Sequence, residues 1–229
     1  MLNHCIGSSR FSILRKFAFI FVVALLAAGQ VLAQEPEGMS RRRALADLQQ
    51  KNAEIRVDAC AVLAELGTPG DLPPLMAALY DSDARVRQAA ESAIWHVWGR
   101  SGDQATDRLF ERGLAQMQSG DLPAAVETFG RVIGMNPDFA EGWNKRATAY
   151  FLLGEDDLSL KDCAEVLKRN PQHFGVLSGY GQIYVRKGDL ERALDYFRRA
   201  LHVNPNMEGV RNSIELIEKL LVERRRKFI

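Results

Sequence analysis

Apolar residues recur every three or four positions through most of the chain, which is the spacing of a helix with one apolar face. Two segments of the C-terminal half show it most clearly, at Ala125, Phe129, Val132 and Ile133 and at Ala193, Phe197, Ala200 and Leu201. No segment of convincing length alternates strictly between apolar and polar residues, as a strand with one buried face would. The pattern therefore predicts an all-α protein.

Several residues of the C-terminal half recur at one constant interval. This interval separates Asn136 from Asn170 and Asn170 from Asn204. The repeated positions are the pairs Asn136-Pro137, Asn170-Pro171 and Asn204-Pro205, the small residues Gly113, Ala147 and Gly181, and the glycines Gly120, Gly154 and Gly188. A small residue in mid-helix lets a neighbouring helix approach closely, and a glycine at a helix end adopts the left-handed conformation that stops the helix. Proline then ends the second helix. Each unit is therefore expected to be a hairpin of two antiparallel helices.

The second helix of each hairpin has an acidic residue near its start. Asp121, Asp156 and Asp189 are candidate N-caps, because their carboxylates can accept hydrogen bonds from free backbone N–H groups. An isolated hairpin cannot bury its own apolar face, so the hairpins must stack. Residues 208–223 are expected to close the stack as a capping helix. The predicted dry face of this helix carries Val210, Ile214, Ile217, Leu220 and Leu221.

These residues resemble the motif of the tetratricopeptide repeat, which places Trp or Leu, a small residue, Tyr, Gly, Ala, an aromatic residue, Ala and Pro at fixed positions. The second unit matches at Trp143, Ala147, Tyr150, Gly154 and Pro171, and the third at Gly181, Tyr184, Gly188, Ala193, Phe197, Ala200 and Pro205. The chain departs from the motif at Gln116, Ser159 and Cys163. The resemblance covers residues 105–223 and implies a right-handed superhelical solenoid. Its expected parts are repeats at 106–139, 140–173 and 174–207 and the capping helix at 208–223.

Residues 40–100 carry a second self-similarity, with a slightly shorter period. The matching pairs include Leu48 and Leu79, Ala53 and Ala84, Arg56 and Arg87, Ala59 and Ala90, and Leu63 and Ile94. Residues 67–71 indicate a turn, and Pro73-Pro74 fits only the first turn of the next helix. The segment 83–90 resembles the HEAT-type repeat, in which an Asp caps the second helix and an Arg pairs with neighbouring acids. The block is therefore predicted to form HEAT-like hairpins.

Two tryptophans close this N-terminal block. Trp95 and Trp98 flank His96 near the end of its last predicted helix. Such a cluster fits a binding spot, but a large aromatic pair where two helical stacks meet more often seals their interface. We therefore expect a seal. Residues 101–103 indicate a linker, and its shortness implies that the two blocks touch.

Residues 1–33 have the pattern of a secretory signal peptide. Basic residues at Arg10, Arg15 and Lys16 precede an apolar run at 17–28, and Val31-Leu32-Ala33 provides a cleavage site after Ala33. The expected location is the periplasm of a bacterium or the exterior of the cell. The alternative is a retained inner-membrane anchor, although the run is shorter than the roughly 20 residues that span a bilayer. After cleavage, no stable membrane insertion is expected.

Charge and cysteine content narrow the function classes. Without residues 1–33 the chain has 27 Lys and Arg against 29 Asp and Glu, a formal charge of −2. Nucleic-acid binding is disfavoured, because neutralising phosphates requires clustered basic residues. Cys60 and Cys163 fall on the apolar faces of different predicted helices, where a free Cys behaves as a small hydrophobic residue. A structural disulfide is therefore not expected.

The sequence offers little chemistry. The mature chain has three histidines, at 96, 173 and 202, and none forms a helical His-x-x-x-His or Glu-x-x-His pair for a metal. It also lacks a nucleophile elbow and a phosphate loop. The acidic run 155–157 is expected to cap a helix, and Arg146 to pair with Asp162. We expect the protein to bind no metal and no cofactor and not to be an enzyme. The alternative is an enzyme or an enzyme accessory, since HEAT-like repeats also resemble a family of chromophore lyases.

In the family that the chain resembles, the first helix of each repeat lines a concave groove that holds a peptide or a partner helix. The corresponding residues here are Phe110, Leu114, Met117, Asn144, Thr148, Phe151, Ser178, Gln182 and Val185. Family members that grip chaperone C-termini use Lys, Asn and Arg, and only Asn144 resembles that set. Asn144 and Gln182 are instead expected to bond the backbone of an extended protein partner, with Phe110 and Leu114 covering an apolar side chain. The alternative is that some of these side chains support the N-terminal block.

Overall fold

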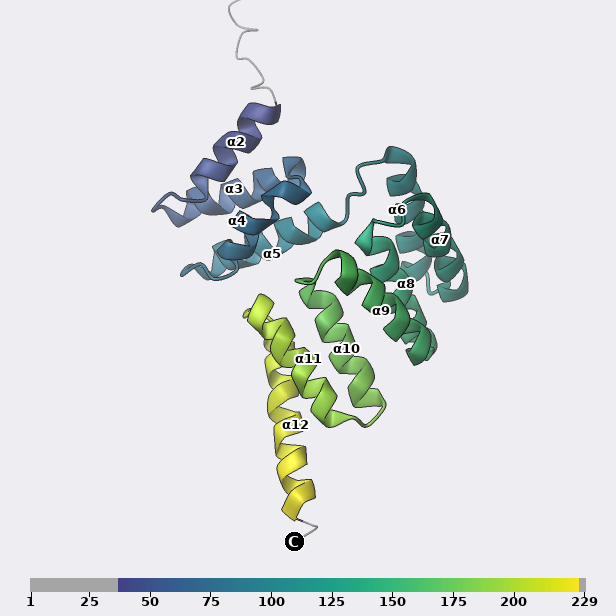
Figure 1. Ribbon diagram of the computed structural model, residues 1–229. Helices are drawn as coiled ribbons and strands as arrows, with labels where there is room; N and C mark the ends of the chain where they lie inside the picture. The colour runs from purple at the N-terminus through teal and green to yellow at the C-terminus, as the bar shows by residue number, and fades with distance from the viewer. Residues whose placement is uncertain (1–36, 227–229) are drawn as a thin grey trace, which may run out of the picture. The chain divides into compact units, whose positions relative to one another are not determined.

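The computed structural model describes residues 37–226, in which every regular element is helical (Figure 1). The prediction of an all-α hairpin solenoid is confirmed. Residues from Arg41 onward form one compact unit, and the description below concerns that unit. The predicted signal peptide, residues 1–33, lies outside the described residues.

The N-terminal block, residues 41–100, contains the larger part of α2, three further α-helices and a 3₁₀ turn. They are α2 (Glu37–Asp47), α3 (Ala53–Leu66), η1 (Pro69–Asp71), α4 (Leu72–Ala78) and α5 (Ala84–Trp98). The prolines at 73 and 74 lie in the first turn of α4, where a missing N–H breaks no helical bond. Asn52 and Asp83 cap α3 and α5 by accepting from the backbone N–H two residues on.

The core of this block is apolar, and its turns are held by arginines. Leu63, Leu75 and Ile94 are fully buried between α3, α4 and α5. Arg56 binds both carboxylate oxygens of Asp81 at 2.7 Å, so it links the start of α3 to the turn after α4. Such a two-point contact fixes geometry as well as charge.

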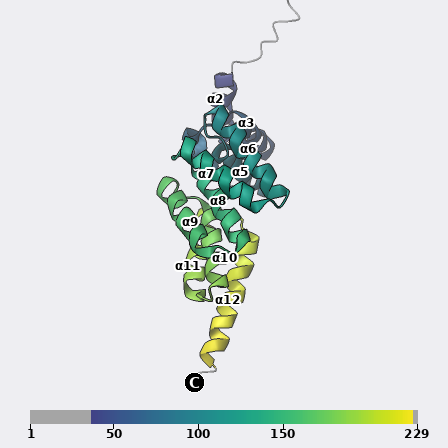
Figure 2. The same cartoon turned by 90° about the vertical axis from the view of Figure 1, so that its right-hand side faces the viewer.

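The C-terminal part, residues 104–226, consists of three hairpins and a long final helix. The hairpins are α6 (Gln104–Gln118) with α7 (Leu122–Met135), α8 (Ala140–Leu153) with α9 (Asp156–Arg169), and α10 (Phe174–Arg186) with α11 (Leu190–Val203). The final helix is α12 (Glu208–Arg226). In two orthogonal views α10, α11 and α12 lie side by side (Figures 1 and 2).

The periodic glycines have the roles that the spacing predicts. Gly120, Gly154 and Gly188 adopt φ values of 82°, 84° and 75°, in the left-handed region. A Cβ on Gly113 would lie 2.6 Å from the ring of Phe129, and a Cβ on Gly181 2.4 Å from the ring of Phe197. The absence of a side chain therefore lets one aromatic ring fill the space inside each of these hairpins.

One of the three predicted N-caps is wrong. Asp121 and Asp189 cap α7 and α11, but Asp156 is the first helical residue of α9 and Glu155 holds the cap position without a side-chain cap bond. Glu155 lies exactly one repeat period from both Asp121 and Asp189, so the repeat register, not the nearest Asp, decides the cap. Asp156 instead forms an ion pair with Arg186 of the next repeat.

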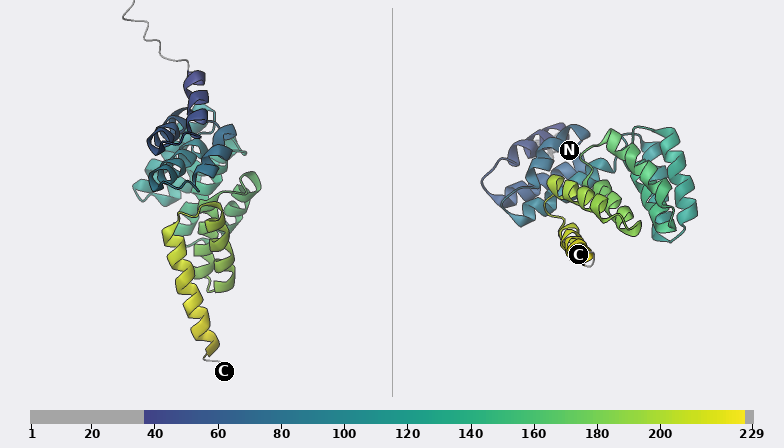
Figure 3. Two further views of the ribbon diagram at one scale, coloured as in Figure 1. Left: turned by 90° about the vertical axis from the view of Figure 1, so that its left-hand side faces the viewer. Right: turned by 60° about the horizontal axis from the view of Figure 1, so that its bottom comes forward.

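The final helix α12 packs one face on α11, as the sequence predicts, with one exception. Val210, Ile217 and Leu221 are buried, whereas Leu220 is 44% exposed. Consecutive residues of a helix are about 100° apart, so Leu220 points away when Leu221 faces the core. The helix continues past the α10–α11 hairpin (Figure 3).

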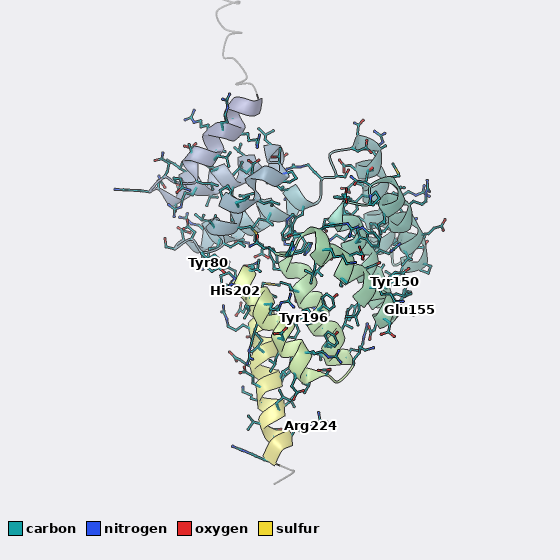
Figure 4. All side chains as sticks on the ribbon, in the orientation of Figure 1. Tyr80, Tyr150, Glu155, Tyr196, His202 and Arg224 are labelled. Carbon is teal, nitrogen blue, oxygen red and sulfur yellow. The ribbon has the colours of Figure 1, made fainter. Side chains whose placement is uncertain are left out.

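The N-terminal block docks on the third repeat, which is distant in sequence. Phe174 at the start of α10 is fully buried in the core of the block. The ring of Trp98 stacks on His173 with centroids 4.3 Å apart, and Trp95 meets Phe174 edge to face at 5.2 Å. The hydroxyl of Tyr80 donates to the His202 carbonyl (Figure 4). The predicted aromatic seal is therefore confirmed.

Candidate functional site

An open cavity of about 210 Å³ lies between α8, α9 and α10. We call it the groove cavity. It is lined by Asn144, Ala147, Thr148, Phe151, Ser159, Cys163, Gly175, Val176, Gly179, Gln182 and Ile183. Four of the nine residues predicted to line a groove therefore meet at one place, namely Asn144, Thr148, Phe151 and Gln182. Among the described residues, no charged side chain lines this cavity.

Hydrogen bonds fix the polar side chains of α8 at this cavity. The Nδ2 of Asn144 donates to Oε2 of Glu141 at 2.9 Å, which leaves the amide oxygen as an acceptor. The hydroxyl of Thr148 donates to the backbone carbonyl of Asn144 at 2.9 Å. Gln182 on α10 is exposed, and its side chain makes no hydrogen bond to the described residues. The cavity thus offers two amide side chains, that of Asn144 fixed by a hydrogen bond and that of Gln182 without one.

Asn144 is held in turn by a buried polar cluster. Glu141 is 2% exposed, and its Oε1 lies 2.5 Å from Nε2 of His173. The Nδ1 of His173 accepts the backbone N–H of Val176 at 3.1 Å and so caps α10. Because a backbone N–H can only donate, Nδ1 carries no proton, and the ring donates from Nε2 to the carboxylate.

Glu141 stays ionised in this cluster. Burial raises the pKa of its carboxyl, but His173, the nearby charge of Lys145 and the Asn144 amide outweigh burial and lower the pKa to about 2. The Lys145 ammonium lies 3.7 Å from Oε2. The carboxylate therefore serves as a fixed acceptor that orients Asn144 toward the cavity.

The sequence did not point to Glu141 and His173 as site residues. The signal was present in the repeat register, because His173 occupies the repeat position that Phe139, a core residue, holds at the end of the first repeat. A polar residue in place of a buried aromatic residue requires a polar partner. The partner, Glu141, is 32 residues away, and only the folded chain shows the contact.

Two glycines remove side chains from the α10 wall of the cavity. A Cβ on Gly175 would lie 2.5 Å from the ring of Trp95, so this glycine lets the N-terminal block approach. A Cβ on Gly179 would meet nothing within 4 Å. Gly179 therefore faces open space and gives a ligand access to the helix backbone.

The other predicted groove residues lie elsewhere. Phe110 is 3% exposed and packs against Phe129 and Phe139, with ring centroids 5.7 and 5.0 Å apart. Phe110 and Leu114 border a second cavity of about 430 Å³, whose other wall includes Trp95 of the N-terminal block. Met117 packs on the same core as Phe110, Ser178 is buried, and Val185 is 41% exposed. These three residues line neither cavity.

The cysteines and the charged pair of the second repeat have surroundings that favour a structural role. Cys60 and Cys163 are free and buried, and burial raises their thiol pKa to about 11 and about 12. Arg146 forms the predicted ion pair with Asp162, through bonds of 2.7 and 2.8 Å. Within residues 37–226, no three potential ligands gather to hold a metal ion, and none of the helices has the length and apolar character of a membrane span.

Two models of the tetratricopeptide repeat match the chain, over residues 110–166 and 174–207. Tetratricopeptide repeats are thus supported over these residues. A TPR repeat-containing protein of Rhizobium etli is 30% identical over 128 residues, which are 56% of this chain and 63% of that protein. The small glutamine-rich tetratricopeptide repeat-containing protein 2 of Mycosarcoma maydis is 24% identical over 47% of this chain and 31% of its own length. This chain thus spans less than two thirds of either relative.

Two solved structures share the fold of the repeats. The first TPR domain of the Spaghetti protein RPAP3, solved with the HSP90 peptide SRMEEVD, gives a TM-score of 0.50 at 24% identity and covers 52% of this chain and 94% of that domain. The Sgt2 TPR domain of Aspergillus fumigatus gives 0.51 at 17% identity, over 54% and 83%. Tetratricopeptide repeat proteins mediate protein–protein interaction as scaffolds and adaptors, and the fold is generally not enzymatic.

Proposed function

We propose that this protein is an exported adaptor whose repeats bind an extended segment of a partner protein between α8 and α10. One observation carries the proposal. Residues that are scattered along the sequence from Asn144 to Gln182 meet at one open cavity with oriented polar groups. Open concave sites with a few placed polar groups in an apolar lining are typical of binding sites.

The chemistry of the lining suggests the kind of segment that binds. The Asn144 oxygen can accept a backbone N–H of the partner, and the Gln182 amide can both donate and accept. The bare backbone at Gly179 allows a close approach. A charged side chain would lose its hydration here without gaining a partner, which costs several kcal/mol. We therefore propose an uncharged, extended segment.

In this proposal the N-terminal block is a HEAT-like support for the groove. The contact of Trp95 with Gly175 and the buried position of Phe174 anchor the start of α10, which forms one wall of the cavity. The caps at Asn52 and Asp83 and the Arg56–Asp81 ion pair support the assignment to HEAT-like hairpins. The block would keep the groove in one shape before the partner arrives, which lowers the entropy lost on binding.

Export to the periplasm is the second part of the proposal. It rests on the basic, apolar and small-residue pattern of residues 1–33. The alternative is an adaptor that keeps this segment as an inner-membrane anchor. N-terminal sequencing of the protein purified from cells discriminates them: cleavage after Ala33 gives a chain that begins at Gln34, whereas an anchored protein retains residues 17–28.

The groove is tested by filling it. Gly179→Leu places a side chain in the cavity without meeting other atoms near its Cβ, and Gly134→Leu is the matched control, because Gly134 on α7 is exposed and equally free of neighbours. A photo-crosslinking amino acid at Gln182 captures the partner in intact cells. We expect Gly179→Leu to abolish the captured band and Gly134→Leu to keep it. Equal capture by both variants would show that the partner binds elsewhere.

A further inference from the structure

The groove cavity lies where the second repeat lacks an aromatic ring that the other two repeats have. Phe129 and Phe197 occupy the same position in the first and third repeats, and their rings fill their own hairpins. In the second repeat this position is Cys163, and the facing small residue is Ala147. Both of these residues line the cavity.

The size of the cavity matches the missing group. An apolar cavity of about 150 Å³ in another protein suffices to bind benzene, and the groove cavity has about 210 Å³. Both hydroxyls of its lining already donate to backbone carbonyls, Ser159 to Ala147 at 2.8 Å and Thr148 to Asn144 at 2.9 Å. An unfilled space of this kind loses the dispersion contacts that a ring would make.

The chain does not fill the space with a neighbouring ring. Tyr180 belongs to the same hydrophobic cluster as Cys163, but its ring stacks on Tyr196 with centroids 4.4 Å apart. Its hydroxyl donates to the Leu160 carbonyl at 3.1 Å. Phe151 also lines the cavity, and the Arg186 guanidinium lies 3.9 Å from its ring centroid. Both rings are therefore held by other contacts.

We propose that the cavity at Cys163 is a subsite for one aromatic, phenyl-sized side chain of the bound partner segment. The partner would supply the ring that Phe129 and Phe197 supply in the first and third repeats. This inference rests on the proposed function and refines it, because it names the side chain that the groove selects. The backbone of the segment then lies within reach of Asn144 and Gln182.

The experiment uses small uncharged probes in place of the unidentified partner. N-acetyl-phenylalaninamide and N-acetyl-alaninamide are titrated into the full mature chain, and amide shifts of Gly179 and Gln182 are followed by NMR. We expect saturable shifts with the phenylalanine probe, with a dissociation constant on the order of 1 mM. The alanine probe is expected to bind at least tenfold more weakly.

Two variants locate the binding. The double variant Ala147→Gly with Cys163→Phe recreates the Gly113–Phe129 arrangement and fills the cavity with the protein's own ring, so it should fold and bind the phenylalanine probe at least tenfold more weakly. Ala147→Gly alone keeps the cavity and should still bind. Thermal unfolding of each variant checks that it is folded.

The outcomes separate this inference from the proposed function. If the parent chain gives no saturable shift, or if the filled variant binds the phenylalanine probe as well as the parent, the subsite is wrong. Loss of partner capture in Gly179→Leu would still support the groove in that case. Probe binding by the parent together with unchanged capture in Gly179→Leu would show that the cavity binds a ring but that the partner binds elsewhere. That result would overturn the assignment of the cavity as a subsite for the partner.

Discussion

The imidazole of His173 donates from Nε2 to Glu141 at 2.5 Å, across a sequence separation of 32 residues, and neither side chain reaches the surface. The same imidazole caps α10 through Nδ1 and stacks on Trp98. One side chain therefore connects the second repeat, the third repeat and the N-terminal block. Its carboxylate partner also orients Asn144 at the groove cavity.

Removing this carboxylate should destabilise the fold strongly. Glu141→Ala leaves the Nε2–H of His173 and the Asn144 amide buried without an acceptor, and breaking a buried pair in this way costs about 3–5 kcal/mol of the free energy of unfolding. Urea denaturation measures the change. Glu111→Ala, at an exposed position on α6, is the control and should stay within about 0.5 kcal/mol. A similar small effect of both variants would contradict the structural role of Glu141.

The same group predicts a dependence of stability on pH. The pKa of Glu141 is lowered to about 2 from an ordinary value of 4.5, so the unfolded chain binds this proton more tightly than the folded one. The stabilisation is present above pH 4.5 and is lost as the pH falls from 4.5 toward 2. Urea titrations across this window should show the loss in the parent. Glu141→Gln has no carboxyl to titrate, so its stability should depend less steeply on pH in this window. An unchanged pH dependence in this variant would contradict the prediction.

Two glycines on α10 should respond in opposite directions to the same change. Gly181→Ala forces a Cβ against the Phe197 ring, and overpacking of this kind costs about 1–3 kcal/mol. Gly179→Ala meets no atom within 4 Å, and the higher helix propensity of Ala should stabilise the protein by up to about 1 kcal/mol. Thermal unfolding of the two variants tests this. Stabilisation by both would mean that Phe197 does not pack on Gly181.

A buried ion pair should contribute more to the free energy of unfolding than an exposed one. Arg146→Ala leaves Asp162, which is 4% exposed, without its partner, and the expected loss is about 2–4 kcal/mol. Arg198→Ala breaks a pair with Glu218 in which both side chains are well exposed, and the loss should stay below about 1 kcal/mol. Chemical denaturation compares the two. An equal loss of stability in the two variants would show that the Arg146–Asp162 pair is not protected from solvent.

The aromatic seal should couple the unfolding of the N-terminal block to that of the repeats. Trp98→Ala removes the ring that stacks on His173 and contacts Phe174, at an expected cost of about 3 kcal/mol. We expect the parent to unfold in a single transition and the variant's transition to broaden or split, because the two parts then share fewer contacts. Calorimetry detects the change. A sharp single transition in the variant would indicate that other contacts suffice for the coupling.

Much of the fold follows from the sequence because its signals are local. The repeat period, the glycine turns and the small residues at Gly113 and Gly181 each act within one hairpin, where contacting residues are close in the chain. The paired Arg146 and Asp162 could be predicted for the same reason, since both belong to the second repeat. The cap of α9 differs from the sequence prediction because the repeat register places Glu155, and not Asp156, at the cap position.

The candidate site was predictable only in part. The sequence determined which helix faces are apolar and which positions correspond between repeats, because helical geometry fixes both. It did not determine that the N-terminal block docks on the third repeat, that His173 meets Glu141, or that Cys163 leaves a space beside Asn144. These contacts join residues far apart in the chain, and packing of whole hairpins decides them, since no local pattern records which surfaces meet.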